Sequence, residues 1–130
     1  MKRVTGIGGI FFKSDHPEQL YAWYEKHLGL KRHTAQESCV LPSPPDDHGP
    51  REFYLSFFPR STKYFEPSSA SFMINYRVED LDAVIAALHA EGIEIIARED
   101  YDFGRFAWIM DPEGNRVELW QPAKPTTINV

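Results

Sequence analysis

The stretch Tyr101–Pro122, YDFGRFAWIMDPEGNRVELWQP, decides the fold of this chain. Residues 103–110 form an apolar, aromatic run of strand length that is bounded by turn residues. Residues 111–115 (DPEGN) combine a proline, which fixes one φ angle, with glycine and asparagine, which tolerate positive φ. Residues 116–121 then alternate in polarity, as a strand with one buried face does. The stretch therefore predicts two strands joined by a tight turn.

Glu118 stands in the middle of the second of these strands. The two-residue period of a strand places it on the face of Arg116 and Trp120, opposite Val117 and Leu119. An unpaired buried carboxylate is very costly. If Glu118 faces inward, it must therefore be paired, protonated or bound to a cation.

The sequence DPEGNRVELWQP, preceded by an aromatic strand, resembles the closing hairpin of the vicinal-oxygen-chelate superfamily, which includes glyoxalase I, extradiol dioxygenases and the fosfomycin and bleomycin resistance proteins. The resemblance implies an α+β fold in which two βαβββ modules form a curled mixed sheet around a ligand cup. It places Glu118 at the position of the family's last metal ligand. It also implies a homodimer, and a C2 arrangement is the commonest closed symmetry.

Size and composition narrow the class of protein. A chain of 130 residues has enough length for one domain with one core. The net charge of −5 argues against nucleic acid or an anionic membrane as the partner. No window approaches the apolar length of a membrane span, and we interpret the N-terminus as a strand, not a signal peptide. The single cysteine, Cys39, is interpreted as an ordinary free thiol and fits a reducing cytoplasm.

The first module is expected over about residues 1–60. Its predicted elements are a strand over Val4–Lys13, a helix from Pro17 to Gly29, a second strand within Lys31–Val40 and a strong strand over Phe53–Phe58. The apolar face of the helix comprises Leu20, Trp23, Tyr24 and Leu28, which we expect in the core. The prolines and glycine of Leu41–Arg51 predict a surface loop, in which Asp46, Asp47 and His48 are interpreted as a solvated turn, not a metal cluster.

The second module is expected over about residues 68–122, after a polar connector over Pro59–Ser69 and before a C-terminal tail, residues 123–130. Its predicted elements are a strand over Ser71–Val78, a helix capped near Asp80 and closed by Gly92, a strand over Ile93–Ala97, a charged link over Arg98–Asp102 and the closing hairpin. The order strand, capped helix, three strands thus appears twice, which indicates a duplicated unit.

The resemblance also implies four metal positions inside the cup. Counting from the helix caps and from the prolines after the last strands places Gly9, Leu55, Met73 and Glu118 there. Glycine and leucine supply no ligand, and the methionine thioether is too soft for hard divalent ions. A catalytic ion needs three or four ligands. We therefore predict no cofactor, with a divalent metal held partly by Glu118 as the alternative.

Strand parity predicts an aromatic cup with a few polar groups, which suits a small organic ligand. If Met110 pairs with Arg116, then Trp108 stands opposite Glu118 and Phe106 opposite Trp120. The alternative is that these aromatic residues fill a closed core. The candidate ligand-binding residues are Phe11, Met73, Asn75, Arg105, Phe106, Trp108, Glu118 and Trp120.

Glu118, the candidate catalytic residue, admits three interpretations: an acid paired with Arg105 or Arg77, a general base whose pKa is raised by aromatic surroundings, or a binding group for a cationic ligand. The sequence does not choose among them. The predicted function is therefore metal-free binding of a small organic molecule. The alternatives are a metal-dependent lyase or dioxygenase of the same superfamily, a metal-free acid/base enzyme, or a domain that binds nothing.

Overall fold

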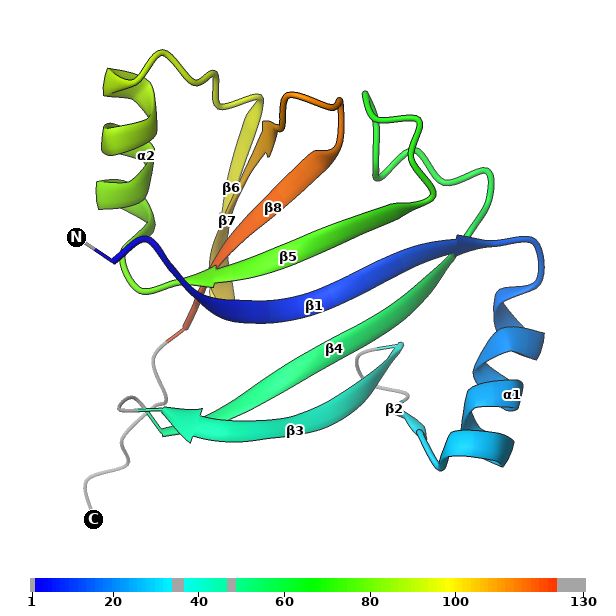
Figure 1. Ribbon diagram of the computed structural model, residues 1–130. Coiled ribbons are helices and arrows are strands. Elements are labelled where there is room, and N and C mark those ends of the chain that lie inside the picture. The colour runs from blue at the N-terminus through cyan, green and yellow to red at the C-terminus, as the bar shows by residue number, and fades with distance from the viewer. Residues whose placement is uncertain (1, 34–36, 47–48, 124–130) are drawn as a thin grey trace.

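The computed structural model describes residues 2–33, 37–46 and 49–123. One curled, eight-stranded mixed sheet runs through the molecule, with strand order β2-β3-β4-β1-β5-β8-β7-β6, and two helices lie outside it (Figure 1). The elements of the first half are β1 (Val4–Ser14), α1 (Pro17–Leu28), β2 (Arg32–His33), β3 (Ser38–Asp46) and β4 (Gly49–Pro59). Those of the second half are β5 (Phe72–Val78), α2 (Leu81–Ala90), β6 (Ala97–Tyr101), β7 (Gly104–Met110) and β8 (Arg116–Pro122).

The two halves meet at the centre of the sheet, where β1 and β5 pair antiparallel, with Phe11 opposite Met73. Each central strand has a parallel partner on its other side: β4 beside β1 and β8 beside β5. The order strand, helix, three strands occurs in both halves. The predicted α+β fold with a repeated unit and a curled sheet is therefore confirmed.

The predicted signals for the helix ends are present. Pro17 opens α1, and Gly29 ends it with φ at +70°, a conformation that glycine adopts without steric cost. At the start of α2, the Asp80 side chain accepts a hydrogen bond from the Ala83 amide at 3.1 Å. Both helices bury apolar residues against the convex face of the sheet, α1 beside Leu55 and Phe57 and α2 beside Ala107 and Leu119. The concave face is thus left for the site.

Two residues of α1 that were expected in the core are not there. Trp23 is 51% exposed and Leu28 57% exposed, whereas Tyr21 is 4% exposed. Trp23 instead lies against Tyr24 and His27 on the outer surface. Tyr21 packs against Phe57 and Leu55 of β4 while Trp23 and Leu28 face outward, so the inward stripe of the helix is narrower than the apolar pattern suggested.

The segment Leu41–Arg51 was predicted to be a loop, and this prediction is wrong. β3 and β4 run through it as an antiparallel pair, with Leu41 opposite Phe53. β2 pairs only with Ser38 and Cys39, so most of β3 lies at the sheet edge. Prolines are tolerated there because an edge strand does not need every N–H group. Asp47 and His48 lie outside the described residues, so the interpretation of that acidic turn stays a prediction.

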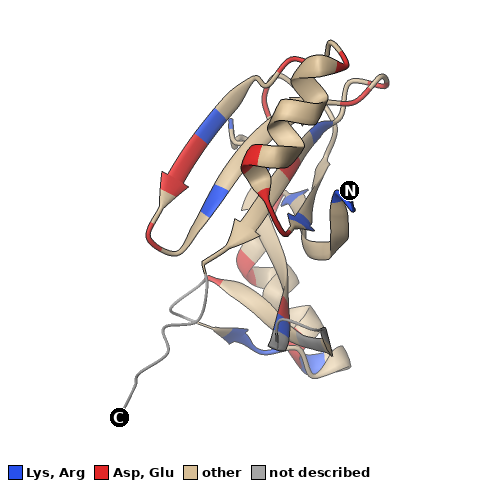
Figure 2. Ribbon diagram, turned by 90° about the vertical axis from the view of Figure 1, so that its left-hand side faces the viewer, with Lys and Arg blue, Asp and Glu red and all other residues tan. Residues whose placement is uncertain are grey.

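The second strand of the second half was also predicted in the wrong place. β6 covers Ala97–Tyr101, the segment expected to be a charged link, and not Ile93–Ala97. Ile95 packs beside α2, and Ile96 packs against the cluster of Phe65, Met73 and Trp108. These apolar side chains therefore pack into the core just before the strand begins. β6 pairs only with β7, and as an exposed edge strand it accommodates charges of both signs (Figure 2).

Within the described part of the chain, no helix has the length and apolar character to cross a membrane.

Candidate functional site

The concave face of the sheet holds a cleft of about 620 Å³, which we call the cup. Strands from both halves of the chain line it: β1, β3, β4, β5, β7 and β8. Two aromatic walls face it, and the polar side chains lie among them. One wall comprises Phe11, Phe58 and Tyr64, and the other comprises Tyr54, Phe103, Phe106 and Trp120.

Glu118 is buried at the base of the cup, with 1% of its surface exposed. Its Oε1 atom accepts hydrogen bonds from the Tyr64 hydroxyl and, at 3.0 Å, from the Trp108 indole N–H. Its Oε2 atom accepts one from the Asn75 amide group at 2.5 Å. Because these donors are neutral, the carboxylate is satisfied without the arginine partner that was one of its expected alternatives.

The surroundings of Glu118 act on its protonation in opposite directions. Burial raises the pKa of the carboxyl above its ordinary value, while the hydrogen bonds from Tyr64, Asn75 and Trp108 and the charge of Arg116 oppose that rise. Burial removes hydration from the charged form and is the larger effect, so the pKa of Glu118 is raised. Burial and the adjacent Glu118 also raise the pKa of the Tyr64 hydroxyl, which therefore keeps its proton.

Tyr64 was not among the predicted site residues. It lies in the connector between β4 and β5, which the sequence indicated only as a polar link. Arg116 holds it in place: the guanidinium lies 5.6 Å from the Tyr64 ring and 4.9 Å from the Trp108 ring, and it donates a hydrogen bond to the Tyr64 carbonyl. An aromatic pair, Tyr64 and Phe65, inside an otherwise polar connector was the signal that could have indicated an inward-facing segment.

Trp120 and Phe106 form the flat part of the second wall. Their ring planes differ by 7° and their centroids are 6.2 Å apart. Tyr54 meets Trp120 edge-on, and Phe103, which is 66% exposed at the β6–β7 turn, meets Phe106 edge-on. The Arg77 guanidinium lies 4.9 Å from the Trp120 ring. A flat ligand placed against this wall would gain contact area with little loss of side-chain freedom.

Most of the predicted ligand-binding residues do lie together. Trp108 pairs with Glu118 and Phe106 with Trp120 across the hairpin, as predicted. Five of the predicted residues line the cup: Phe11, Asn75, Phe106, Glu118 and Trp120. Trp108 lies behind them and contributes through its hydrogen bond to Glu118.

Two predicted residues lie elsewhere. Met73 is fully buried among Phe65 and Trp108, beneath the cup and not on its lining. Arg105 lies on the opposite face of β7, where its guanidinium pairs with Asp82 of α2 at 2.9 Å. Because Arg105 precedes Phe106 by one position, strand alternation places it on the helix-covered side.

Two of the four inferred metal positions were assigned to the wrong residues. Leu55 packs beside Tyr21 of α1, whereas its neighbours Tyr54 and Ser56 face the cup. On β1, the residue that lines the cup is Gly8, because the pairing with β5 shifts between Ile7 and Gly9. A change of one residue in strand register reverses the face of every side chain, which is why counting from the helix cap failed for Gly9 and counting from Pro59 failed for Leu55.

Gly8 makes room for the polar base. A Cβ atom at this position would lie 2.3 Å from the Asn75 Oδ1 atom and 2.7 Å from the Trp120 ring. No side chain larger than hydrogen fits there without movement of its neighbours. Gly8 therefore allows Asn75 and Trp120 to approach the centre of the sheet.

The cup contains few groups that bind metal. The cup-facing residues on β1, β4, β5 and β8 include one carboxylate, Glu118, and in the described ranges no three histidine, cysteine, aspartate or glutamate side chains gather at one point. The neighbours of that carboxylate direct N–H and O–H hydrogens toward it, so hydrogens and not lone pairs face the carboxylate oxygens. This donor set does not fit a divalent ion, which needs several oxygen or nitrogen ligands.

The curled sheet, built from two halves with the same order of strands and helix, defines the fold class of this chain. A sequence model of the Glyoxalase/Bleomycin resistance protein/Dioxygenase superfamily matches residues 6–119, and the chain belongs to this superfamily. A comparison with curated protein sequences gave no match.

Solved structures with the same fold include methylmalonyl-CoA epimerases. A variant of the Streptomyces coelicolor enzyme in complex with 2-nitronate-propionyl-CoA has a TM-score of 0.67 and 16% identity, covering 95% of this chain and 99% of the other. The Mycobacterium tuberculosis epimerase has a TM-score of 0.58 and 20% identity, covering 95% and 91%. A glyoxalase/bleomycin resistance protein/dioxygenase superfamily member from Vibrio splendidus 12B01 has a TM-score of 0.55 and 13% identity, covering 86% and 95%. At these identities, the likeness concerns the fold alone.

Proposed function

We propose that this protein binds a small, flat organic molecule in the cup, without a bound divalent ion. One observation carries the proposal: the Glu118 carboxylate, 1% exposed, lies between two aromatic walls and is already held by neutral donors. The aromatic walls supply contact area, and the polar base supplies orientation, which is the usual division of roles in a ligand site.

The charge of the cup favours one kind of ligand. Glu118 is the only acidic side chain on the described lining, and no arginine, lysine or histidine accompanies it there. A carboxylate oxygen has room for a second hydrogen bond, and Oε2 accepts one from Asn75. A ligand with an N–H group or a positive charge is therefore favoured at the base, where the Trp120 face adds cation–π attraction.

The proposal can be tested with three naphthalene compounds that differ only in the attached group. They are 1-naphthylmethylamine, which is cationic, 1-naphthylacetamide, which is neutral, and 1-naphthylacetate, which is anionic. We expect the first two to raise the melting temperature of the protein, since a ligand that binds only the folded state stabilises it by mass action. The acetate should not, because burying two carboxylates together is costly. Failure of all three compounds to shift the melting temperature contradicts the proposal.

Proton transfer by Glu118 is a second candidate function, and the raised pKa of its carboxyl favours it. A general base works best when its pKa approaches the working pH. In this case the carboxylate takes a proton from a bound molecule and the Tyr64 hydroxyl steadies it. Glu118→Gln distinguishes the two functions: loss of turnover with retained binding supports proton transfer, and weaker binding of the amine alone supports the binding role.

A further inference from the structure

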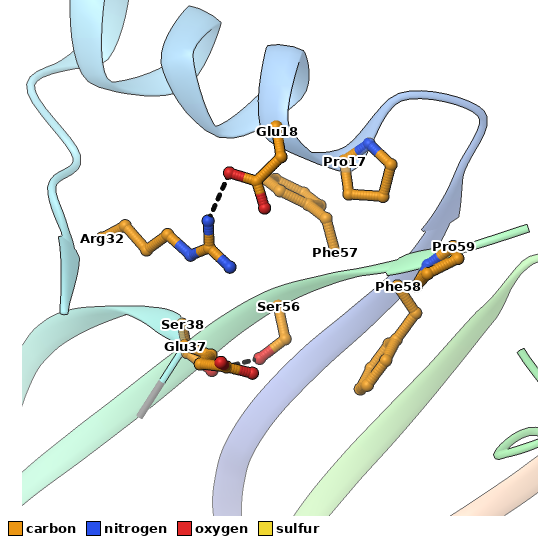
Figure 3. A pocket seen from close by; sticks show the side chains of 9 residues that line it. All are labelled: Pro17, Glu18, Arg32, Glu37, Ser38, Ser56, Phe57, Phe58 and Pro59. Atoms are coloured by element: carbon orange, nitrogen blue, oxygen red, sulfur yellow. Dashed lines mark hydrogen bonds and ion pairs between the residues drawn. The ribbon is translucent and has the colours of Figure 1, made fainter. Parts of the chain in front are cut away.

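A second cleft, of about 540 Å³, lies beside the first turn of α1, between that helix and the strands β3 and β4 (Figure 3). Pro17 and Glu18 belong to its helix side, and Glu37 and Ser38 lie on the opposite side. None of the predicted ligand-binding residues lies on the elements that line this cleft, which are α1, β2, β3 and β4.

The second cleft and the cup share part of their walls. Ser38, Ser56 and Phe58 line both of them. The two serine hydroxyls lie 2.6 Å apart in a hydrogen bond, and each residue is 7% exposed. Serine is among the smallest side chains, so the common wall is thin and polar where it separates the two spaces. The place where the two clefts meet is therefore lined with groups that can donate to and accept from a ligand.

The walls of the second cleft are fixed by Tyr21, which is 4% exposed. Its hydroxyl donates to the Glu37 carbonyl at 2.9 Å and accepts from the Phe57 amide at 2.8 Å, so it ties together two sides of the cleft. The Arg32 guanidinium lies 4.4 Å from the Tyr21 ring and pairs with Glu18 at 2.6 Å (Figure 3). The cleft is thus held open by side chains that are themselves held in place.

The charge of the second cleft resembles that of the cup. Its described lining carries two acids, Glu18 and Glu37, and one base, Arg32. The ion pair between Glu18 and Arg32 leaves Glu37 as the excess negative charge. With Glu118 at the base of the cup, both spaces have a negative group. A ligand that occupies both is favoured when its two ends carry hydrogen-bond donors or positive charge.

We propose that the cup and the second cleft are two ends of one binding site, joined at Ser38 and Ser56, and that its ligand is elongated. One end of the ligand is a flat ring against Trp120 and Phe106. The other is a chain with N–H donors or positive charge that passes the serine pair and reaches Glu37. This proposal rests on the proposed function, since it extends the ligand that the cup holds.

The test compares probes that share a head and differ in the tail. The head alone is 1-naphthylacetamide, the cationic tail is supplied by 1-naphthylacetyl spermine, and the anionic tail by N-(1-naphthylacetyl)glutamate. We expect the spermine conjugate to bind at least about tenfold more tightly than the head, because charge-assisted hydrogen bonds are among the stronger polar contacts. The glutamate conjugate should bind no more tightly than the head alone. Calorimetry or naphthyl fluorescence measures each dissociation constant.

Variants test where the tail of the spermine conjugate binds. Ser56→Leu fills the junction and should abolish the advantage of the spermine conjugate while the head still binds. Glu37→Lys should lower the same advantage, and Glu94→Lys, an exposed acid outside both clefts, should leave it unchanged. Because Glu37 is exposed, its substitution carries the test even where Ser56→Leu does not fold.

The outcomes separate the two proposals. Binding of the head with no gain from the cationic tail overturns the elongated site and leaves the proposed function standing. A gain from the tail that survives both Ser56→Leu and Glu37→Lys also overturns the elongated site, because the tail then lies elsewhere. Absence of any binding by the head contradicts the proposed function and the elongated site with it.

Discussion

The Tyr64 hydroxyl donates a hydrogen bond to the Glu118 carboxylate although the two residues are separated by 54 positions in the sequence. Tyr64 comes from the connector between the halves, and Glu118 comes from the last strand. The bond closes one side of the cup and gives the buried acid a neutral partner. The same contact therefore contributes to the stability of the fold and to the chemistry of the site.

Tyr64→Phe removes this donor and leaves the Trp108 N–H as the other donor to Oε1. We expect the free energy of unfolding at neutral pH to fall by about 1–3 kcal/mol, because a buried carboxylate loses a hydrogen bond. Denaturant unfolding measures the change. Tyr24→Phe is the control, since Tyr24 lies on α1 and packs beside Phe57, away from the cup. An equal loss in both variants would mean that the Tyr64 hydroxyl adds nothing.

Glu118→Gln changes how stability depends on pH. The folded-state pKa of Glu118 is raised above 4.5, its ordinary value. The native protein therefore holds this proton more tightly than the unfolded chain does, and the associated stability is present below pH 4.5 and is lost as the pH rises through the folded pKa. We expect the variant to lose less stability than the natural protein between pH 4.5 and neutrality. Melting temperatures across this range measure it, and parallel curves would contradict the raised pKa.

Gly8→Ala tests the close approach of Asn75 and Trp120 to β1. The new methyl group would contact both, so we expect a loss of about 1–3 kcal/mol of stability, as for other overpacked sites. Trp120→Phe removes the ring atoms that the methyl group meets, so the double variant should lose less than the sum of the two single changes. Strictly additive losses, measured by denaturant unfolding, would contradict this contact.

Trp120→Ala removes the flat wall of the cup. We expect the affinity for 1-naphthylmethylamine to fall by about tenfold or more, since aromatic contacts dominate small apolar sites. Trp23→Ala is the matched control, because Trp23 is 51% exposed on the far side of α1. Titration calorimetry measures both variants, and equal affinities would place the ligand outside the cup.

Metal analysis of protein purified without a chelator tests whether the cup has enough side chains to coordinate a metal ion. We expect less than one equivalent of zinc, nickel, iron or manganese, because Glu118 is the only carboxylate on the described lining. Addition of each ion should leave the melting temperature unchanged, since binding to the folded state would raise it. One bound equivalent that is lost in Glu118→Gln would support the metal-dependent alternative.

The closing hairpin shows how much of the structure a local sequence pattern can predict. Its turn chemistry, its alternation and the pairing of Trp108 with Glu118 were all predicted and are confirmed. The pattern failed at β3 and β6, where edge strands accommodate prolines and charges that local propensity assigns to loops. It failed again at Leu55, because strand parity depends on a register that neighbouring strands decide. The homodimer, the cytoplasmic location and the roles of the site residues stay predictions.

The sequence by itself determined the repeated strand and helix order, the superfamily and the presence of an acid on the inner face of the last strand. These depend on the periodicity and turn chemistry of short segments, which are read locally. The tertiary structure alone decided that Tyr64 reaches Glu118, that Gly8 makes room for Asn75, and that Ser38 and Ser56 line both the cup and a second cleft. Such contacts join residues far apart in the chain, and they exist only once the curvature and register of the whole sheet are set.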